Sequence, residues 1–371
     1  MCFGPTVAPR VFTKIVSVVA AHLRTQIIRL AVYLDDWLCL NQIHQHLLKD
    51  QYVCLNLLIK LGFLVNLEKS NLIPQQIITY IGAVFNLKLG LILPTEERFL
   101  KIQNAILDLV NGKNKAQNFL HLLGLMASWL ELIPNARLFM RPIQLHLLSF
   151  WKPSSYSWDM IIPFTPHLQS HLRWWLNPAN IFKGRSLHQT LSEVIITTDA
   201  SKKMYGGHLG NQYFQGTWPL DQINWHINSL EMEAVFLTVN HFLSQIQGKS
   251  VLIKTDNTTV AQYINKQGGT KSSKLCIQTR KLWTLAIQNN ISLRANHIVG
   301  TQNILADQLS RHKIRTTEWS LSPFVVQNFF QLWGTPLIDL FASVDNHQTP
   351  IFCSWFPTNQ AFAIDALRIS W

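Results

Sequence analysis

The sequence predicts an α/β (α+β) protein that is built from more than one folded unit. The clearest observation is an alternation of β, β, β, α, β, α character between Glu193 and Arg311, which is typical of a mixed sheet covered by helices. A second observation is the stretch Ile27–Leu40, in which two apolar, β-rich runs flank a short acidic turn and predict a hairpin. Between these parts, residues 95–150 show helical periodicity that is broken at Gly112.

Local signals predict the elements of the first half. Asn41 is placed to cap a helix with an apolar stripe from Ile43 to Ile59, and Gly62 can end that helix. Thr95 precedes two glutamates and is expected to cap a further helix, because acids stabilise a first turn. Short strands are expected near 63–65, 77–80 and 83–87, and two more helices at 116–132 and after residue 134.

The second half contains a more regular series. The stretch 152–190 is rich in Pro, Ser, Trp and His and is interpreted as a linker with one helical piece near His167–Leu176. A strand at Glu193–Thr198 then ends in Asp199. Further strands are expected at 205–209, 212–218, 251–255 and 291–297, and helices at 230–243, 257–265, 273–288 and 303–311.

The bulk composition excludes several classes of protein. The chain has 371 residues, enough for two or three domains, and its 48% hydrophobic content and mean hydropathy of +0.10 are typical of a folded chain. No run of about eighteen uncharged apolar residues is present, so no membrane span is expected, and the N-terminus does not resemble a secretory signal. The five cysteines are far apart and never spaced as a zinc motif, which fits free thiols in an intracellular, cytoplasmic or nuclear, compartment.

Positive charge dominates the chain and lies mainly in its first half. The sequence has 32 Lys and Arg against 20 Asp and Glu, a formal net charge of +12 with a pI near 9.6. Residues 1–190 hold 18 basic and 9 acidic residues, whereas residues 191–371 hold 14 and 11. This balance indicates an anionic partner, most often nucleic acid, although a basic solvated surface without a partner would give the same numbers.

Four acidic residues in the second half are placed where a sheet can gather them. Asp199 follows the first strand, Glu231 lies in the first helix, Asp256 follows a later strand and Asp307 lies in the last helix. Carboxylates in one pocket repel each other, and two Mg²⁺ ions roughly 4 Å apart would resolve that conflict while activating water for phosphodiester cleavage. The alternative is that these are four ordinary acids at helix caps and strand ends.

Four short motifs resemble, in order, those of retroelement ribonuclease H (RNase H) domains. They are Thr-Asp-Ala-Ser at 198–201, Leu-Glu-Met-Glu-Ala at 230–234, Lys-Thr-Asp-Asn at 254–257 and Asn-Ile-Leu-Ala-Asp-Gln-Leu-Ser-Arg at 303–311. The resemblance implies an RNase H-like mixed-sheet domain that hydrolyses the RNA strand of an RNA–DNA hybrid with two Mg²⁺ ions, or with Mn²⁺. It assigns Asp199, Glu231, Asp256 and Asp307 as catalytic metal ligands.

The order of the acids separates RNase H from other nucleases with this sheet. Integrases and transposases have their glutamate last rather than second, and proofreading exonucleases have a glutamate where Ser201 stands here. Two choices stay open. Glu233 competes with Glu231 for the role in the helix, and His297 either assists product release or simply ends a strand.

The first half resembles part of a reverse transcriptase. Tyr33–Asp36 reads Tyr-Leu-Asp-Asp on the expected hairpin, and a polymerase needs carboxylates on such a turn to hold two Mg²⁺ ions. The segments 3–12, 61–70 and 80–82 resemble neighbouring parts of the palm and primer grip. The resemblance assigns Asp35 and Asp36 as metal ligands. It also assigns contacts with template–primer nucleic acid to Tyr33, Lys69 and Arg10, although Lys69 is equally well interpreted as a solvated lysine at the end of a helix.

One departure from the reverse-transcriptase pattern concerns the metal ligands. Reverse transcriptases have a further metal-binding Asp well upstream of the hairpin, but no Asp or Glu precedes Asp35 in this chain. We therefore expect an N-terminally truncated palm with an incomplete ligand set, and no primer extension by this chain alone.

The motifs together most resemble the polyproteins of DIRS-type retrotransposons, with gypsy-like elements second. Residues 333–343 and the pairs at 354–355 and 365–366 resemble the stretch that follows RNase H in such elements. The expected division is a partial palm at 1–90, a helical thumb or connection at 91–150, a linker at 151–190, an RNase H-like domain at 191–312 and a truncated segment without assigned activity at 313–371. Two other hypotheses are a catalytically decayed nucleic-acid-binding fragment and an inert, poorly folded fragment.

Overall fold

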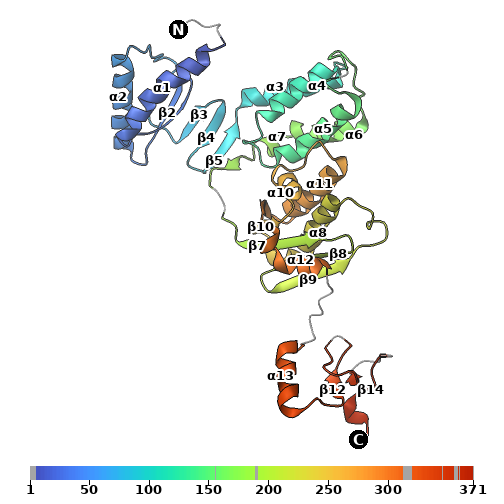
Figure 1. The fold of residues 1–371 in the computed structure, drawn as a ribbon. Helices are drawn as coiled ribbons and strands as arrows, with labels where there is room; N and C mark the ends of the chain where they lie inside the picture. Colours follow the sequence, from blue (N-terminus) through green and yellow to red (C-terminus); the bar gives the residue numbers. More distant parts are fainter. Residues whose placement is uncertain are drawn as a thin grey trace.

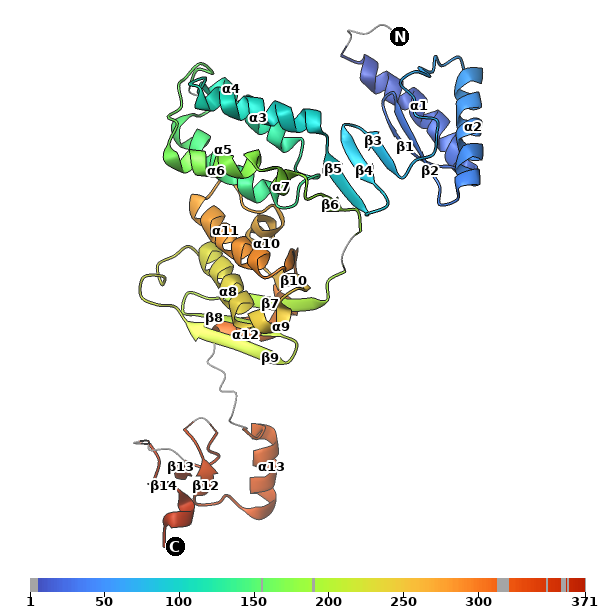
Figure 2. The same cartoon turned by 180° about the vertical axis from the view of Figure 1, so that it is seen from behind.

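The computed structural model describes residues 6–154, 156–188, 191–311, 320–344, 346–354, 358 and 360–370. Figure 1 shows the elements along the chain, and Figure 2 shows them from behind. Parts of two expected motifs, residues 3–5 and Trp355, lie outside the described residues. Within the described residues, no helix is both long and apolar enough to cross a bilayer.

The N-terminal unit contains the expected hairpin between two helices. It consists of α1 (Ala8–Thr25), β1 (Arg29–Tyr33), β2 (Asp36–Leu40) and α2 (His44–Lys60). The register pairs Tyr33 with Asp36, so Leu34 and Asp35 form a two-residue turn, and Leu34 has the left-handed φ of 52° that such a turn requires. The hairpin prediction is confirmed, but helix α1 had no counterpart in the sequence analysis.

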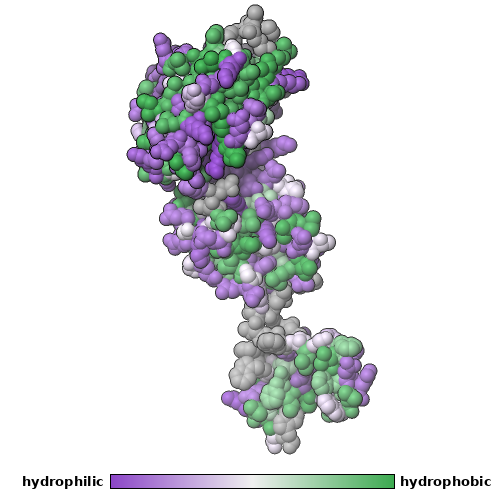
Figure 3. All heavy atoms as spheres, turned by 90° about the vertical axis from the view of Figure 1, so that its left-hand side faces the viewer, coloured by the Kyte–Doolittle hydropathy of each residue, from purple (hydrophilic) through white to green (hydrophobic). Residues whose placement is uncertain are grey.

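This unit has a small core and much exposed apolar surface. Leu23, Leu30 and Leu58 are buried between the helices and the hairpin, whereas Val18 of α1 is 71% exposed. Figure 3, which views the molecule from this side, shows apolar side chains on the surface of its upper part. Among the described residues β1 and β2 pair only with each other, and because an isolated two-stranded sheet is marginal, α1 and α2 must supply its stability.

The strand expected near residues 63–65 is not formed. Gly62 adopts a φ of 81° at the end of α2, and the backbone N–H of Phe63 donates to the carbonyl of Leu58 at 3.0 Å. These bonds satisfy the last carbonyls of the helix, so the apolar residues after Gly62 belong to a helix-terminating motif rather than to a strand. Phe63 and Val65 pack instead against the core of the N-terminal unit.

A second, four-stranded sheet follows. It contains β3 (Ile77–Tyr80), β4 (Ala83–Asn86) and β5 (Leu91–Pro94), which form an antiparallel meander, and β6 (Arg185–Ser186). Strand β6 pairs with β5 although the two lie more than ninety residues apart (Leu91 opposite Ser186). This sheet therefore joins a segment that precedes the following helices in the sequence with one that comes after them.

The helical unit is built from α3 (Glu96–Val110), α4 (Ala116–Ala127), α5 (Ala136–Phe150), α6 (Pro166–Leu176) and α7 (Pro178–Ile181). The cap prediction is confirmed, because the Thr95 hydroxyl accepts from the Arg98 N–H at 3.4 Å. The three main helices meet in one core, with Phe119 and Trp129 among its largest buried side chains.

The segment 151–190, expected to be a linker, belongs largely to this core instead. Trp151, Leu172 and Trp175 are at most 2% exposed, and α6 packs against α5. Thr165 caps α6 by accepting from the Leu168 N–H at 3.2 Å. The Pro and Trp residues that suggested an irregular connection therefore start helices and fill a core, and burial of that apolar area stabilises the segment.

The third unit has the mixed sheet that the sequence predicts. Its strands are β7 (Val194–Ala200), β8 (Met204–Leu209), β9 (Gln212–Thr217), β10 (Ser250–Thr255) and β11 (Ser292–His297), in the spatial order β11-β10-β7-β8-β9. Strands β7, β8 and β9 are antiparallel, whereas β7, β10 and β11 are parallel. The helices are α8 (Ile227–His241), α9 (Leu243–Ile246), α10 (Thr258–Asn265), α11 (Ser273–Gln288), η1 (Gly300–Gln302) and α12 (Ile304–Arg311).

Helices cover both faces of this sheet, and two adjacent glycines let them approach. Figures 1 and 2 show α8 and α11 on one face and α12 on the other. A Cβ on Gly206 would lie 2.3 Å from the Leu309 Cβ of α12, and a Cβ on Gly207 would lie 2.4 Å from the Thr238 Oγ1 of α8. Because successive residues of a strand face opposite sides, this pair brings one helix close to each face of β8.

The helical and mixed-sheet units are in contact. The guanidinium of Arg141 on α5 donates to the carbonyl of Lys266 at 3.3 Å, and Gln267 donates to Asn135 at 2.7 Å. The last described part is a small unit with α13 (Pro323–Trp333), β12 (Asp339–Ala342), β13 (Phe352–Ser354), β14 (Ala363–Ile364) and η2 (Ala366–Arg368), whose three strands are parallel.

Replacement of Gly206 by Ala tests the close approach of α12. The added methyl group would overlap Leu309, so we expect Gly206→Ala to lower the free energy of unfolding by about 2 kcal/mol or more. Gly124→Ala is the matched control, because nothing lies within 4 Å of a Cβ at that helical position. Removing a glycine there should stabilise the chain by about 0.5–1 kcal/mol. Urea unfolding followed by circular dichroism measures both, and equal effects of the two variants would contradict the packing argument.

Candidate metal centre

The mixed sheet brings Asp199 and Asp256 to the same edge. Asp199 is the penultimate residue of β7, and Asp256 directly follows β10, which runs parallel beside it. The register pairs Lys254 with Thr197, so Asp256, two residues further on, comes level with Asp199. Carboxyl ends of adjacent parallel strands are a common location for ligand sites in α/β proteins, because side chains from several strands converge there.

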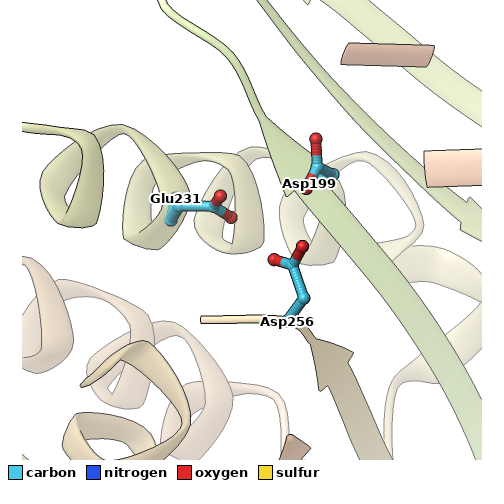
Figure 4. A group of neighbouring side chains, drawn as sticks. All are labelled: Asp199, Glu231 and Asp256. Carbon is cyan, nitrogen blue, oxygen red and sulfur yellow. The ribbon is translucent and has the colours of Figure 1, made fainter. Parts of the chain in front are cut away.

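Glu231 reaches the same place from helix α8. Oxygens of Asp199, Glu231 and Asp256 all lie within 4.8 Å of one another, and no other such group of three or more His, Cys, Asp or Glu residues occurs in the described part of the chain. Figure 4 shows the three carboxylates pointing toward a common point from β7, α8 and the end of β10. The structure therefore brings together three of the four acids singled out in the sequence.

Burial and mutual repulsion disfavour the ionised forms of these groups. Asp199 and Glu231 are each 4% exposed, whereas Asp256 is half-buried. Burial, followed by the charges of Asp199 and Asp256, raises the pKa of Glu231 to about 9. Burial also raises the pKa of Asp199 to about 6, although a hydrogen bond from Ser310 opposes that shift. A cation among the three would reverse this electrostatic conflict.

The donor set fits a divalent metal ion. Glu231 Oε2 is buried and accepts no hydrogen bond within the described structure, so one carboxylate oxygen is left for another partner. Three carboxylates supply the hard oxygen ligands that Mg²⁺ and Mn²⁺ take, and binding of either ion would neutralise part of their charge.

Helix α12 fixes the Asp199 side chain. The Ser310 hydroxyl donates to Asp199 Oδ2, and the Asn303 side-chain amide donates to Asp199 Oδ1 at 3.4 Å. The Ser201 hydroxyl in turn donates to the Ser310 carbonyl at 2.6 Å. Ser310 and Asn303 are both buried and were not among the predicted site residues, although both lie in the motif at 303–311. Their position, three or four residues from Asp307, was the signal available.

Asp307 lies outside the group of three carboxylates. Its Oδ1 accepts from Arg311 Nε at 2.6 Å, one helical turn further along α12, and its side chain is 38% exposed. It still lies close enough that its charge contributes to the raised pKa of Asp199. An exposed ion pair at this spacing contributes only about 0.3–0.5 kcal/mol, so it holds Asp307 weakly.

The structure also places Glu233 and His297, the two residues whose roles the sequence left open. Glu233 points to the neighbouring helix α11, where its carboxylate accepts from Gln278 at 3.1 Å and pairs with Lys281 at 3.2 Å. It is therefore engaged away from the cluster, and Glu231 is the glutamate of this helix that joins it. His297 is the last residue of β11 and is exposed.

The residues expected to serve a polymerase lie on the N-terminal unit. Asp35 is in the hairpin turn, Asp36 begins β2 and Tyr33 ends β1, and all three are exposed. Arg10 and Lys69 are exposed as well, on the first turn of α1 and in the segment after α2. In the described residues Asp35 and Asp36 belong to no group of three metal-ligating side chains.

Comparisons with known proteins relate most of the chain to viral polyproteins. No protein-family model matches. The chain is 24% identical to the enzymatic polyprotein of Carnation etched ring virus over 328 residues, which cover 84% of this chain and 46% of that protein. It is 26% identical to the enzymatic polyprotein of Cauliflower mosaic virus (strain NY8153) over 304 residues, which cover 76% and 40%. The chain therefore spans less than half the length of these relatives.

Solved structures give weaker similarities. The foamy viral protease–reverse transcriptase in complex with dsDNA matches at 17% identity with a TM-score of 0.43, over 81% of this chain and 60% of that chain. LC11-RNase H1 in complex with an RNA/DNA hybrid matches at 17% identity with a TM-score of 0.28, over 32% and 93%.

The similarity to the viral enzymatic polyproteins covers three quarters or more of this chain at 24–26% identity. The predicted fold class is confirmed, because a hairpin-bearing α/β part and a helical part precede a mixed-sheet α/β domain.

Replacement of Glu231 by Gln tests the electrostatic conflict. Without divalent cations at pH 8, Glu231 must bind a proton on folding because its pKa is about 9, a cost that Gln does not have, so the substitution should raise the free energy of unfolding by about 1–3 kcal/mol. Glu233→Gln, the same change two residues away, loses the pair with Lys281 and should be neutral or destabilising. Thermal unfolding in EDTA measures both variants.

The pH dependence provides a second measurement of the same conflict. A raised carboxyl pKa means that the folded chain binds more protons than the unfolded chain between the ordinary and the raised value. The free energy of unfolding of the parent should therefore fall as the pH rises from about 4 to about 9, the range set by Asp199 and Glu231. Glu231→Gln should flatten the upper part of this range, and an unchanged profile would contradict the assignment.

Proposed function

We propose that residues 191–311 form a nuclease of the RNase H type, which hydrolyses the RNA strand of RNA–DNA hybrids. The observation that carries the proposal is the convergence of Asp199, Glu231 and Asp256 within 4.8 Å at the edge of a mixed sheet. Carboxylates are rarely buried together without a cation, because their repulsion costs free energy. The order of the motifs along the chain, with the glutamate second, supports RNase H over other nucleases with such a sheet.

The cofactor of the proposed reaction is Mg²⁺, as two ions, with Mn²⁺ as an alternative. Asp199, Glu231 and Asp256 would hold it, with Asp307, whose charge acts on Asp199, as the proposed fourth ligand. Bound divalent ions would supply an activated water and neutralise the charge that develops on the phosphate and the leaving oxygen. The free Oε2 of Glu231 supports this ligand role.

The chain itself contributes rigidity to that site. Ser310 and Asn303 each donate to one oxygen of Asp199, so its carboxylate has a fixed orientation before any ligand arrives. Asp256 is held by the end of β10, and the Asn257 side chain caps α10 directly after it by accepting from the Val260 N–H at 3.1 Å. Preorganised ligands of this kind lose little entropy on binding.

The proposed partners are RNA–DNA hybrids and template–primer nucleic acid. The net charge of +12 supports an anionic partner, and its concentration in residues 1–190 supports contact along the first half. We propose an intracellular location, cytoplasmic or nuclear, on the basis of the dispersed cysteines. The four described cysteines form no disulfide.

The first half is proposed to be a partial palm followed by a helical thumb or connection. The hairpin with Asp35 and Asp36 at its turn supports this, because carboxylates on such a turn suit metal-dependent nucleotidyl transfer. Within retroelements we propose a DIRS-type origin, with gypsy-like elements second, on the sequence motifs of the RNase H part and of residues 333–343.

Asp199→Asn tests the nuclease. The purified chain with Mg²⁺ should cleave the RNA strand of an end-labelled RNA–DNA hybrid, and Asp199→Asn should lower the rate by about a hundredfold or more, because a ligand charge is lost. Glu233→Gln is the matched control and should retain most of the activity, since its carboxylate faces α11. Salt-dependent hybrid binding without Mg²⁺-dependent cleavage by the parent would favour the decayed binding fragment instead.

Primer extension tests the first half. Because Asp35 and Asp36 have no third acid beside them in the described structure, the chain alone should incorporate no labelled nucleotide on a primed RNA template with Mg²⁺. Incorporation above the level of an Asp35→Asn, Asp36→Asn control would show that two acids suffice, and would overturn this expectation.

A further inference from the structure

The last turn of α12 carries a cation directly beside the carboxylate cluster. Arg311 follows Ser310, whose hydroxyl donates to Asp199, so the backbone of this turn lies against the site. The Arg311 guanidinium pairs with Asp307 at 2.6 Å. No other Lys or Arg in the described structure forms an ion pair with one of the four motif acids.

The positive charge of Arg311 interacts with Asp199 and Asp256 as well as with its ion-pair partner Asp307. The hydrogen bond with Asp307 and the charge of Asp307 raise the pKa of Arg311 above its usual range, and the charges of Asp199 and Asp256 add smaller contributions in the same direction. In the opposite direction, the charge of Arg311 lowers the pKa of Asp199 against the larger effect of burial. The guanidinium therefore stabilises the ionised cluster from one side.

We propose that Arg311 is a positioning residue that holds Asp307 out of the carboxylate cluster and weakens the binding of divalent cations there. The inference rests on the proposed function, since it concerns the metal site of that reaction. Arg311 and a bound divalent ion compete for the same negative charge. The ion must attract Asp307 away from Arg311, or bind with three carboxylates while a positive charge stays nearby.

The Arg311–Asp307 ion pair can separate and form again, because both side chains reach the solvent. The pair joins residues one turn apart on an exposed part of α12, with side chains 61% and 38% exposed, so water solvates either partner when it separates. Separation of the pair would free the Asp307 carboxylate, whose charge already acts on Asp199. A merely structural salt bridge would stabilise α12 but would leave the affinity for cations unchanged.

Metal affinity of Arg311→Gln tests the proposal without relying on catalysis. The dissociation constants for Mg²⁺ and Mn²⁺ are measured by calorimetry on the full chain at low salt. We expect roughly threefold to tenfold tighter binding in Arg311→Gln, the size expected when one positive charge near a divalent ion is removed. Arg311→Lys keeps the charge and should bind like the parent. Arg294→Gln on β11 removes an exposed charge elsewhere in the same unit and should have no effect.

A double variant identifies the group that is released. In the Asp307→Asn background, Arg311→Gln should give a smaller gain, because no carboxylate is freed and only the removal of the positive charge remains. Arg311→Ala is a second variant with an uncharged side chain at this position and should bind the ions as Arg311→Gln does. Melting curves check that each variant is folded. Binding by Arg311→Gln that is equal to or weaker than that of the parent, or a gain of undiminished size in the Asp307→Asn background, overturns the proposal. If neither the parent nor the variants bind the ions, both the role of Arg311 and the proposed function fail. If the parent binds them but Arg311→Gln shows no gain, only the role of Arg311 fails.

Discussion

The repulsion among three clustered carboxylates, two of them buried, is the constraint on which the rest of the mixed-sheet unit depends. Asp199 and Glu231 are almost inaccessible to water, and each raises the free energy of the other when ionised. A fold that keeps them together must offset this cost by packing. The core beneath the site does so with fully buried residues from α8, β7 and β10, among them Met232, Ile196 and Ile253. The cluster is thus a place where stability is given up for the capacity to bind a cation.

Helix α12 connects this packing to the chemistry. It can lie on the sheet only because Gly206 has no side chain, and its approach brings three polar groups to the site. Ser310 and Asn303 orient Asp199, while Arg311 engages Asp307. One short helix therefore sets both the geometry of the inner carboxylates and the state of the outer one. Because its contacts with β8 and β7 come from residues a hundred positions apart, local sequence alone does not fix them.

The two halves of the chain differ in how complete their sites are. In the mixed-sheet unit the acids converge from three elements, and covering helices exclude water from two of them. In the N-terminal unit the two acids stand exposed on the turn of a two-stranded sheet, beside helices that leave apolar side chains uncovered. A carboxylate pair in water is screened and poorly oriented, so it binds a cation weakly. Acidic side chains are therefore better placed to bind a cation in the mixed-sheet unit than in the N-terminal unit.

The sequence by itself determined the hairpin at 27–40, the cap at Thr95 and the order of strands and helices after residue 193, because periodicity, capping and turn chemistry are local. Only the tertiary structure decided the rest. It placed 151–190 in a core, paired β6 with β5, turned Glu233 toward α11 and Glu231 toward Asp199, and engaged Asp307 with Arg311. These outcomes depend on which distant surfaces pack together and on side-chain rotamers, and neither is encoded in the spacing of residues along the chain.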